Sequence, residues 1–152
     1  DWITMDDVMS QVATTYSETY VSEMTGEQLM QTLEAVADNL FDPDPYLQSG
    51  GDMVRVGGMD YSIAPTKSLG ERITEARLDN GEPIDPKKTY KVAGWATVNR
   101  TPEGRLIWDI IRDYILATKD PGDVLRLPKV NHPKVIGMSD NPGIADYPGR
   151  VA

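Results

Sequence analysis

The sequence predicts an α+β fold, in which a mixed β-sheet packs against helices and an extended C-terminal tail follows. Two stretches, 25–40 and 101–115, place apolar residues at helical spacing. Shorter stretches before and between them are rich in β-branched and aromatic residues, which is typical of strands. Residues 120–152 contain five prolines and four glycines with little periodicity, so we expect them to form an extended tail.

Length and composition narrow the possibilities further. A chain of 152 residues has the size of one domain, and we expect residues 1–119 to form it, with the tail 120–152 packed on the same domain. The absence of cysteine excludes disulfides and thiolate chemistry. The net charge of −9 argues against non-specific binding to nucleic acid or to an anionic membrane. The sequence contains no apolar run of about 18 residues that would predict a membrane span.

The first elements carry clear start signals. Asp1-Trp2-Ile3 is neither an initiator methionine nor a signal peptide, so we expect a piece of a longer protein. Thr4 and Asp7 have the spacing of a capping box and predict the start of a short helix. Alternating β-branched and aromatic residues predict a strand over Thr14–Met24.

A second capping box, formed by Thr25 and Gln28, predicts the start of a longer helix that ends near Leu40. One side of this helix is apolar. Its other side is predicted to face solvent and carries Glu27, Gln31, Glu34 and Asp38. The two prolines of Asp42–Tyr46 then forbid helix and predict an extended loop.

The loop leads into the stretch Ser49–Tyr61, which we consider the most informative part of the chain. Two glycine pairs, Gly50-Gly51 and Gly57-Gly58, bracket five residues, and we expect a short strand over Met53–Val56. The stretch is either a strand with flexible ends in the core or a binding rim that presents Asp52 and Arg55 beside bare backbone.

The remaining elements alternate between strands and turns. We expect strands over Met59–Ile63 and Arg72–Leu78, followed by a hairpin turn at Asp79-Asn80-Gly81. The run Lys88–Val98 is the longest apolar β run and is predicted to be the central strand of the sheet. Trp95 lies near its C-terminal end, where open sheets place ligands, although a core position is equally open. Pro102 suits the first turn of the last helix, which begins at Thr101.

Several catalytic schemes are excluded by the residues that the chain lacks. The single histidine, His132, lies in the tail and is expected on the surface, so neither a catalytic zinc centre nor a Ser-His-Asp triad is supported. No Walker loop and no GxGxxG fingerprint occurs. On these residues alone, we expect a binding or lid domain. If the chain belongs to an enzyme, its main catalytic groups are expected elsewhere.

The order of elements and several motifs resemble the C-terminal domain of the 5′-nucleotidase family of two-domain metallophosphoesterases. The resemblance covers about residues 1–116 and rests on "DWIT" at the start, "TGEQL" with "LE" in the long helix, and "VGG" after the glycine-bracketed residues. The run "NGEPIDPKKTYKVA" (80–93) is the most specific part. The family's "GGDG" motif is missing after Trp95, and Met53 and Val54 stand where an aromatic residue would stack on a nucleobase.

Three segments, "GGDMVRVGGMDY", "EAVADNLFDPDPY" and "TYKVAGWATVN", together with the closing "NPGIA", look like the SoxB sulfate thiohydrolase branch of this family. This resemblance implies that the intact protein is a periplasmic hydrolase with two manganese ions in an N-terminal metallophosphoesterase domain. It would release sulfate from a cysteine S-thiosulfonate on the swinging peptide of the SoxYZ carrier protein. The chain itself would bind no metal, and it would be inactive alone.

The same resemblance implies that this domain closes over the metal site and forms one wall of the substrate channel. Arg55 would stabilise the anionic sulfonate, Asp52 would position Arg55, and apolar surface would come from Met53 and Trp95. Glycines would leave a narrow slot lined by backbone. The predicted substrate-binding residues are Arg55, Asp52, Met53, Gly51, Gly57 and Trp95. Two alternatives are a nucleotidase-type phosphoesterase domain and a non-catalytic protein-interaction module.

Overall fold

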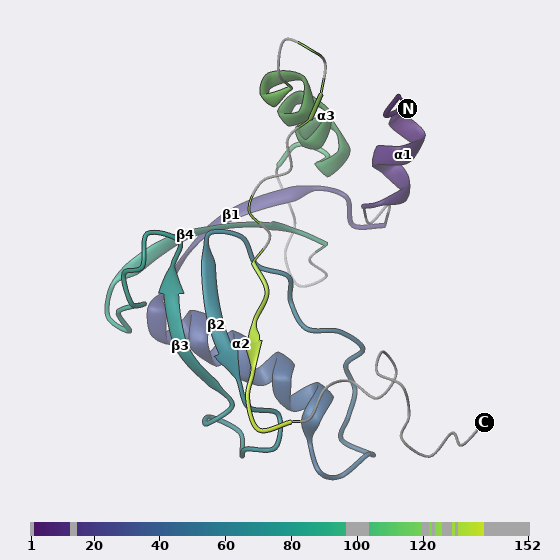
Figure 1. Ribbon diagram of the computed structural model, residues 1–152. Coiled ribbons are helices and arrows are strands. Elements are labelled where there is room, and N and C mark those ends of the chain that lie inside the picture. The colour runs from purple at the N-terminus through teal and green to yellow at the C-terminus, as the bar shows by residue number, and fades with distance from the viewer. Residues whose placement is uncertain are drawn as a thin grey trace, which may run out of the picture. The chain divides into compact units, whose positions relative to one another are not determined.

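The computed structural model describes residues 2–12, 15–96, 104–119, 122, 124–125, 129 and 131–138. The chain divides into two compact units (Figure 1). The first unit comprises Asp1–Met24 and Thr89–Lys129, and the second comprises Thr25–Lys88 and Val130–Ala152. Both units mix helices with strands, which confirms the predicted α+β class. The boundary between a domain ending at residue 119 and a separate tail stays a prediction.

The first unit contains two helices and a two-stranded sheet. Helix α1 (Met5–Ser10) packs against helix α3 (Ile107–Thr118), and strand β1 (Thr19–Thr25) pairs with strand β4 (Thr89–Trp95). The capping box predicted at the start of α1 is present, because the side chain of Thr4 accepts from the backbone N–H of its partner three residues on.

Two element starts in the first unit were predicted at other residues. Strand β1 begins five residues later than expected, and Tyr16 just before it has a φ of 58°, a left-handed conformation that breaks extended structure. The predicted helix start at Thr101 and Pro102 lies outside the described residues, and α3 begins at Ile107 without a side-chain cap.

Strand β4 was expected to be the central strand of a sheet, and this prediction was wrong. It lies in a two-stranded sheet, where it has one neighbour. Exposed and partly buried residues alternate strictly along β4, so one face of the strand is exposed to solvent. The apolar appearance of the run misled the prediction, because small residues such as Ala93 count as apolar yet are exposed here.

The second unit is a mixed three-stranded sheet with a helix against it. Strand β2 (Met59–Ile63) runs antiparallel to β3 (Ile73–Leu78) and parallel to β5 (Lys134–Val135), giving the order β3-β2-β5. Helix α2 (Gly26–Phe41) packs on this sheet (Figure 1), and its predicted capping box is present. The buried core that they share consists of Leu33, Ala37, Met59, Tyr61, Ile63 and Ile73.

The hairpin predicted after β3 is confirmed. Gly81 has a φ of 88°, which only glycine adopts readily, and its N–H donates to the carbonyl of Leu78. The chain then returns along β3, where the N–H of Ile84 donates to the carbonyl of Ala76.

The strand predicted over Met53–Val56 is absent, and this prediction was wrong. Met53 and Val56 both pack against the core although they are three residues apart. In a strand, side chains on one face are separated by two residues, so this spacing belongs to a turning segment. Glycine pairs on both sides leave the backbone free to turn in this way.

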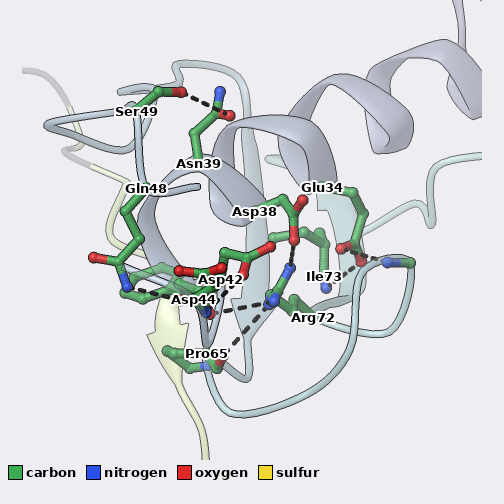
Figure 2. A network of polar contacts seen from close by, with 12 residues as sticks. Glu34, Asp38, Asn39, Asp42, Asp44, Gln48, Ser49, Pro65, Arg72 and Ile73 are labelled. Carbon is green, nitrogen blue, oxygen red and sulfur yellow. Dashed lines mark hydrogen bonds and ion pairs between the residues drawn. The ribbon is translucent and has the colours of Figure 1, made fainter. Parts of the chain in front are cut away.

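The predicted solvent-facing side of α2 was also partly wrong. Glu34 is buried and Asp38 is partly buried, because both bind the segment around Arg72 (Figure 2). Glu27 and Gln31 on the same side are exposed, as predicted. Across the described parts of the chain, none of the helices has the length and apolarity needed to cross a membrane.

Candidate functional site

The candidate site is built on the C-terminal end of α2, where the last carbonyls of a helix need partners from outside the helix. The backbone carbonyl of Asn39 accepts from the N–H of Gly50 at 3.0 Å, and that of Phe41 accepts from the guanidinium of Arg72 at 3.3 Å. Both partners come from distant segments. The end of the helix is therefore the point at which these two segments are fixed.

A compact loop connects α2 to the glycine-bracketed stretch. The carboxylate of Asp42 accepts from the N–H of Asp44 at 2.8 Å, and the carboxylate of Asp44 accepts from the N–H of Tyr46 at 2.9 Å. The side chain of Gln48 donates to the carbonyl of Asp42, and that of Ser49 donates to the side chain of Asn39 (Figure 2). These bonds make the loop a defined turn, because Asx side chains here replace backbone partners.

The stretch 50–58 is held at its two ends and in its middle. At its start, a Cβ built on Gly50 would lie 3.0 Å from the Cβ of Asn39, so the close approach favours glycine. At its end, the carbonyl of Gly58 accepts from the N–H of Asp79 at 3.0 Å. In the middle, Met53 and Val56 pack against the core.

The other three side chains of the bracketed residues, those of Asp52, Val54 and Arg55, are exposed. The side chains of Asp52 and Arg55 are 78% and 93% exposed, and their charged groups are 3.7 Å apart. Val54 between them is also exposed. An exposed guanidinium can bind a sulfonate or phosphate through paired hydrogen bonds, and the nearby carboxylate can restrict where it points. The exposed guanidinium is thus available to an anionic ligand, and the assignment of such a ligand stays a prediction.

The other predicted site residues have different settings. Apart from the neighbouring residues in the chain, no atom lies within 4 Å of a Cβ built on Gly51 or Gly57, so there is space for a ligand beside their backbone. Trp95 is 46% exposed on β4 of the first unit, whereas the stretch 49–61 belongs to the second. The structure thus brings Asp52 and Arg55 together, and the assignment of all six residues to substrate stays a prediction.

No group of three or more His, Cys, Asp or Glu side chains within the described residues is arranged to hold a metal ion. The manganese centre that the resemblance implies belongs to an N-terminal domain outside this chain, so none of the described residues is assigned to it. His132 is exposed, as predicted.

Tyr61, at the end of the informative stretch, is 3% exposed and lies in the core. Burial raises the pKa of its phenol, because the charged phenolate is poorly solvated there. Among the described residues, its hydroxyl has no hydrogen-bond partner. The ring of Tyr61 is part of the buried core of the second unit.

Sequence reasoning missed the polar cluster of Glu34, Asp38 and Arg72. One signal was available, because Asp38 lies in the last turn of α2, where no basic residue accompanies it. A carboxylate is unfavourable at this negative end of the helix dipole, so a cation from elsewhere was to be expected.

The comparisons with known proteins agree on the fold. The profile of the family described as "5′-nucleotidase, C-terminal domain" matches residues 1–108. No protein in the curated collection matches the chain significantly. Among solved structures, the chain is similar to the sulfate thiohydrolase SoxB of Thermus thermophilus in complex with glycerol. The identity is 31%, the TM-score is 0.67, and the match covers 82% of this chain and 23% of that chain.

Two further solved structures show the same fold at lower identity. A putative 5′-nucleotidase from Staphylococcus aureus in complex with alpha-ketoglutarate is 19% identical, with a TM-score of 0.61 and coverage of 88% of this chain and 30% of that chain. A 5′-nucleotidase precursor from Thermus thermophilus is 17% identical, with a TM-score of 0.63 and coverage of 90% and 28%. The present chain spans between 23% and 30% of the length of these relatives.

Proposed function

The chain belongs to the 5′-nucleotidase C-terminal domain family, and from this membership we propose that it is the substrate-binding domain of a sulfate thiohydrolase. The observation that carries the choice within the family is the 31% identity to the sulfate thiohydrolase SoxB, against 19% and 17% for the two nucleotidases. The missing "GGDG" motif and the absence of an aromatic residue at Met53 and Val54 support the same choice.

The proposed reaction is the release of sulfate from a cysteine S-thiosulfonate carried on the swinging peptide of a SoxYZ carrier protein in the periplasm. The catalytic metals, proposed to be two manganese ions, would be held by an N-terminal metallophosphoesterase domain of the full-length protein. The match covers only 23% of the SoxB chain, which leaves room in that protein for a separate metal-binding domain.

Within this proposal, Arg55 binds the sulfonate. Its side chain is 93% exposed, and a charge-assisted hydrogen bond from the guanidinium to a sulfonate oxygen would replace water at little structural cost. Asp52, 3.7 Å away, limits the directions that the guanidinium takes. Met53 is partly buried against the core, so it offers a substrate only the surface that the core leaves exposed.

Backbone access is the second part of the proposal. Open space surrounds Gly51 and Gly57, so an extended carrier peptide with small side chains can approach their backbone closely. Trp95 is nearly half exposed and belongs to the first unit, and its contact with the substrate is proposed from the family resemblance alone.

The test is an assay of the full-length protein, with manganese, on two kinds of substrate. One is a carrier-arm peptide whose cysteine bears a thiosulfonate, and the other is a set of nucleoside monophosphates. We expect sulfate release from the peptide and no phosphate release from nucleotides. Phosphate release without sulfate release would show a nucleotidase-type phosphoesterase, and peptide binding without hydrolysis would show an interaction module. Either result would overturn the proposal.

A further inference from the structure

The C-terminal end of α2 contains a local electrostatic conflict that a distant residue resolves. Asp38 lies in the last turn of the helix, near the negative end of the helix dipole, and this turn contains no basic residue. Arg72, just before β3, supplies the missing cation. Its guanidinium donates to the carboxylate of Asp38 at 2.5 Å and to the carbonyl of Phe41 at 3.3 Å.

Arg72 is held more tightly than an ordinary surface arginine. Its side chain is 2% exposed, and a third bond runs from Nε to the carbonyl of Pro65 at 3.4 Å (Figure 2). The three acceptors lie in different directions, which suits the rigid fork of a guanidinium. A lysine ammonium would keep the charge and could not reach all three acceptors in this geometry.

Glu34 fixes the same segment from the preceding turn of the helix. Its two carboxylate oxygens accept from the N–H of Ile73 at 2.7 Å and from the N–H of Gly70 at 3.0 Å. These two amides lie on either side of Arg72 in the sequence. Two carboxylates of α2 therefore bind one short segment, and the segment in turn neutralises the end of the helix.

The candidate site is attached to this same turn of α2. The carbonyl of Asn39, which immediately follows Asp38, accepts from the N–H of Gly50 at 3.0 Å. Gly50 is the residue at which the chain enters the stretch that carries Asp52 and Arg55. Any change in the direction of the last turn of α2 thus moves the entry to the site.

We propose that Arg72 is a positioning residue: it fixes the last turn of α2 and thereby sets the place of the segment that presents Asp52 and Arg55. The proposal rests on the proposed function only in that these two residues are the ones that bind substrate. The attachment itself follows from the contacts of Arg72 and Gly50.

The test compares two conservative variants of the full-length protein by hydrogen exchange with mass spectrometry. Arg72→Lys keeps the positive charge and removes the planar guanidinium that donates to three acceptors. Ile73→Val removes a methyl group from the core beside it and leaves the backbone bond of residue 73 to Glu34 in place. Local opening exposes the amides that the opened segment protects, so exchange reports where each change acts.

We expect the amides of Gly50 and Gly70 to exchange about tenfold faster in Arg72→Lys than in Ile73→Val. The amides shared between β1 and β4 in the first unit should exchange alike in both variants. Equal exchange at Gly50 in the two variants would overturn the proposal, because the entry to the site would then not depend on the guanidinium.

A second readout separates positioning from general stability. In the sulfate-release assay, Arg72→Lys should raise the KM for the carrier-arm peptide several-fold more than Ile73→Val does at a temperature where both variants are folded. The effect of Arg72→Lys on KM should be largely lost in an Arg55→Ala background. Both changes act on the contact between Arg55 and the substrate, which Arg55→Ala has already removed. Additive effects would contradict the link between Arg72 and Arg55. Failure of sulfate release in the wild type would instead contradict the proposed function and leave the exchange result standing.

Discussion

Two aspartate–arginine pairs in the second unit use the same chemistry in opposite settings. Arg72 is 2% exposed and lies 2.5 Å from Asp38, with two further carbonyl acceptors. Arg55 is 93% exposed and lies 3.7 Å from Asp52. Arg72 is buried and donates to three acceptors in the protein, although the side chain of its partner Asp38 is 29% exposed. The exposed pair leaves most of its hydrogen-bonding capacity to water.

The difference in burial suggests that the Arg72 pair contributes to stability and that the Arg55 pair is available for function. Removing one partner of a buried, hydrogen-bonded pair leaves an uncompensated charge, and this is costly. An exposed pair beyond hydrogen-bonding distance contributes little, because water screens it. Arg55 is therefore free to bind an anionic ligand, while Arg72 can influence a ligand only through the segment that it holds.

The largest expected effect is on the buried pair. Arg72→Met should lower the free energy of unfolding by about 3 kcal/mol, because Asp38 would lose the cation that neutralises it and the carbonyl of Phe41 would lose its donor. Arg55→Met is the matched control and should change the free energy by less than about 0.5 kcal/mol. Urea unfolding of the full-length protein measures both. Equal losses in the two variants would erase the distinction between the pairs.

A smaller effect is expected where a buried polar group has no partner. Tyr61→Phe removes a hydroxyl that makes no hydrogen bond among the described residues, so stability should be unchanged or rise by up to about 1 kcal/mol. The wild type should also lose stability above about pH 10, since burial raises the pKa of the phenol and the unfolded state then releases its proton first. This loss should disappear in the variant. A loss of stability at neutral pH in Tyr61→Phe would show that the hydroxyl is bonded.

The smallest effect concerns a solvent-accessible cluster formed by α3 and by Arg105 just before it. The cluster extends the comparison, because it is more accessible than the Arg72 pair and yet makes short hydrogen bonds. Asp113 accepts from Arg105 and from Arg112, and these hydrogen bonds hold the pKa of its carboxyl below the ordinary value of 3.8. Its contribution to stability is thus present above this value and is lost as the pH falls through the lower folded pKa. NMR titration should show the low midpoint, and Arg105→Gln should raise it. An unchanged midpoint in that variant would contradict the bonding.

Local signals in the sequence predicted local structure well. The capping boxes at Thr4 and Thr25 and the turn at Gly81 depend on residues within a few positions of one another, and all three are present. The family resemblance was also confirmed. Its most specific run, residues 80–93, is likewise a local signal, because it is continuous in the sequence.

Features that depend on distant contacts were not predictable in this way. Glu34 and Asp38 have the spacing of a solvent-facing stripe, and only the approach of Arg72, more than thirty positions along the chain, buries them. The segment Met53–Val56 is too short for its pattern to distinguish a strand from a turn. For the candidate site, the sequence indicated Asp52 and Arg55, and the structure added how α2 holds the segment that presents them.

The most direct measurement is the rate of sulfate release by the full-length Arg55→Ala variant, taken together with its unfolding midpoint. The control is Arg77→Ala, which removes an exposed arginine from β3 of the same unit. We expect Arg55→Ala to lower kcat/KM about tenfold or more with an unchanged unfolding midpoint, and Arg77→Ala to change neither. Wild-type turnover in a fully folded Arg55→Ala protein would contradict the assignment of the exposed pair to substrate.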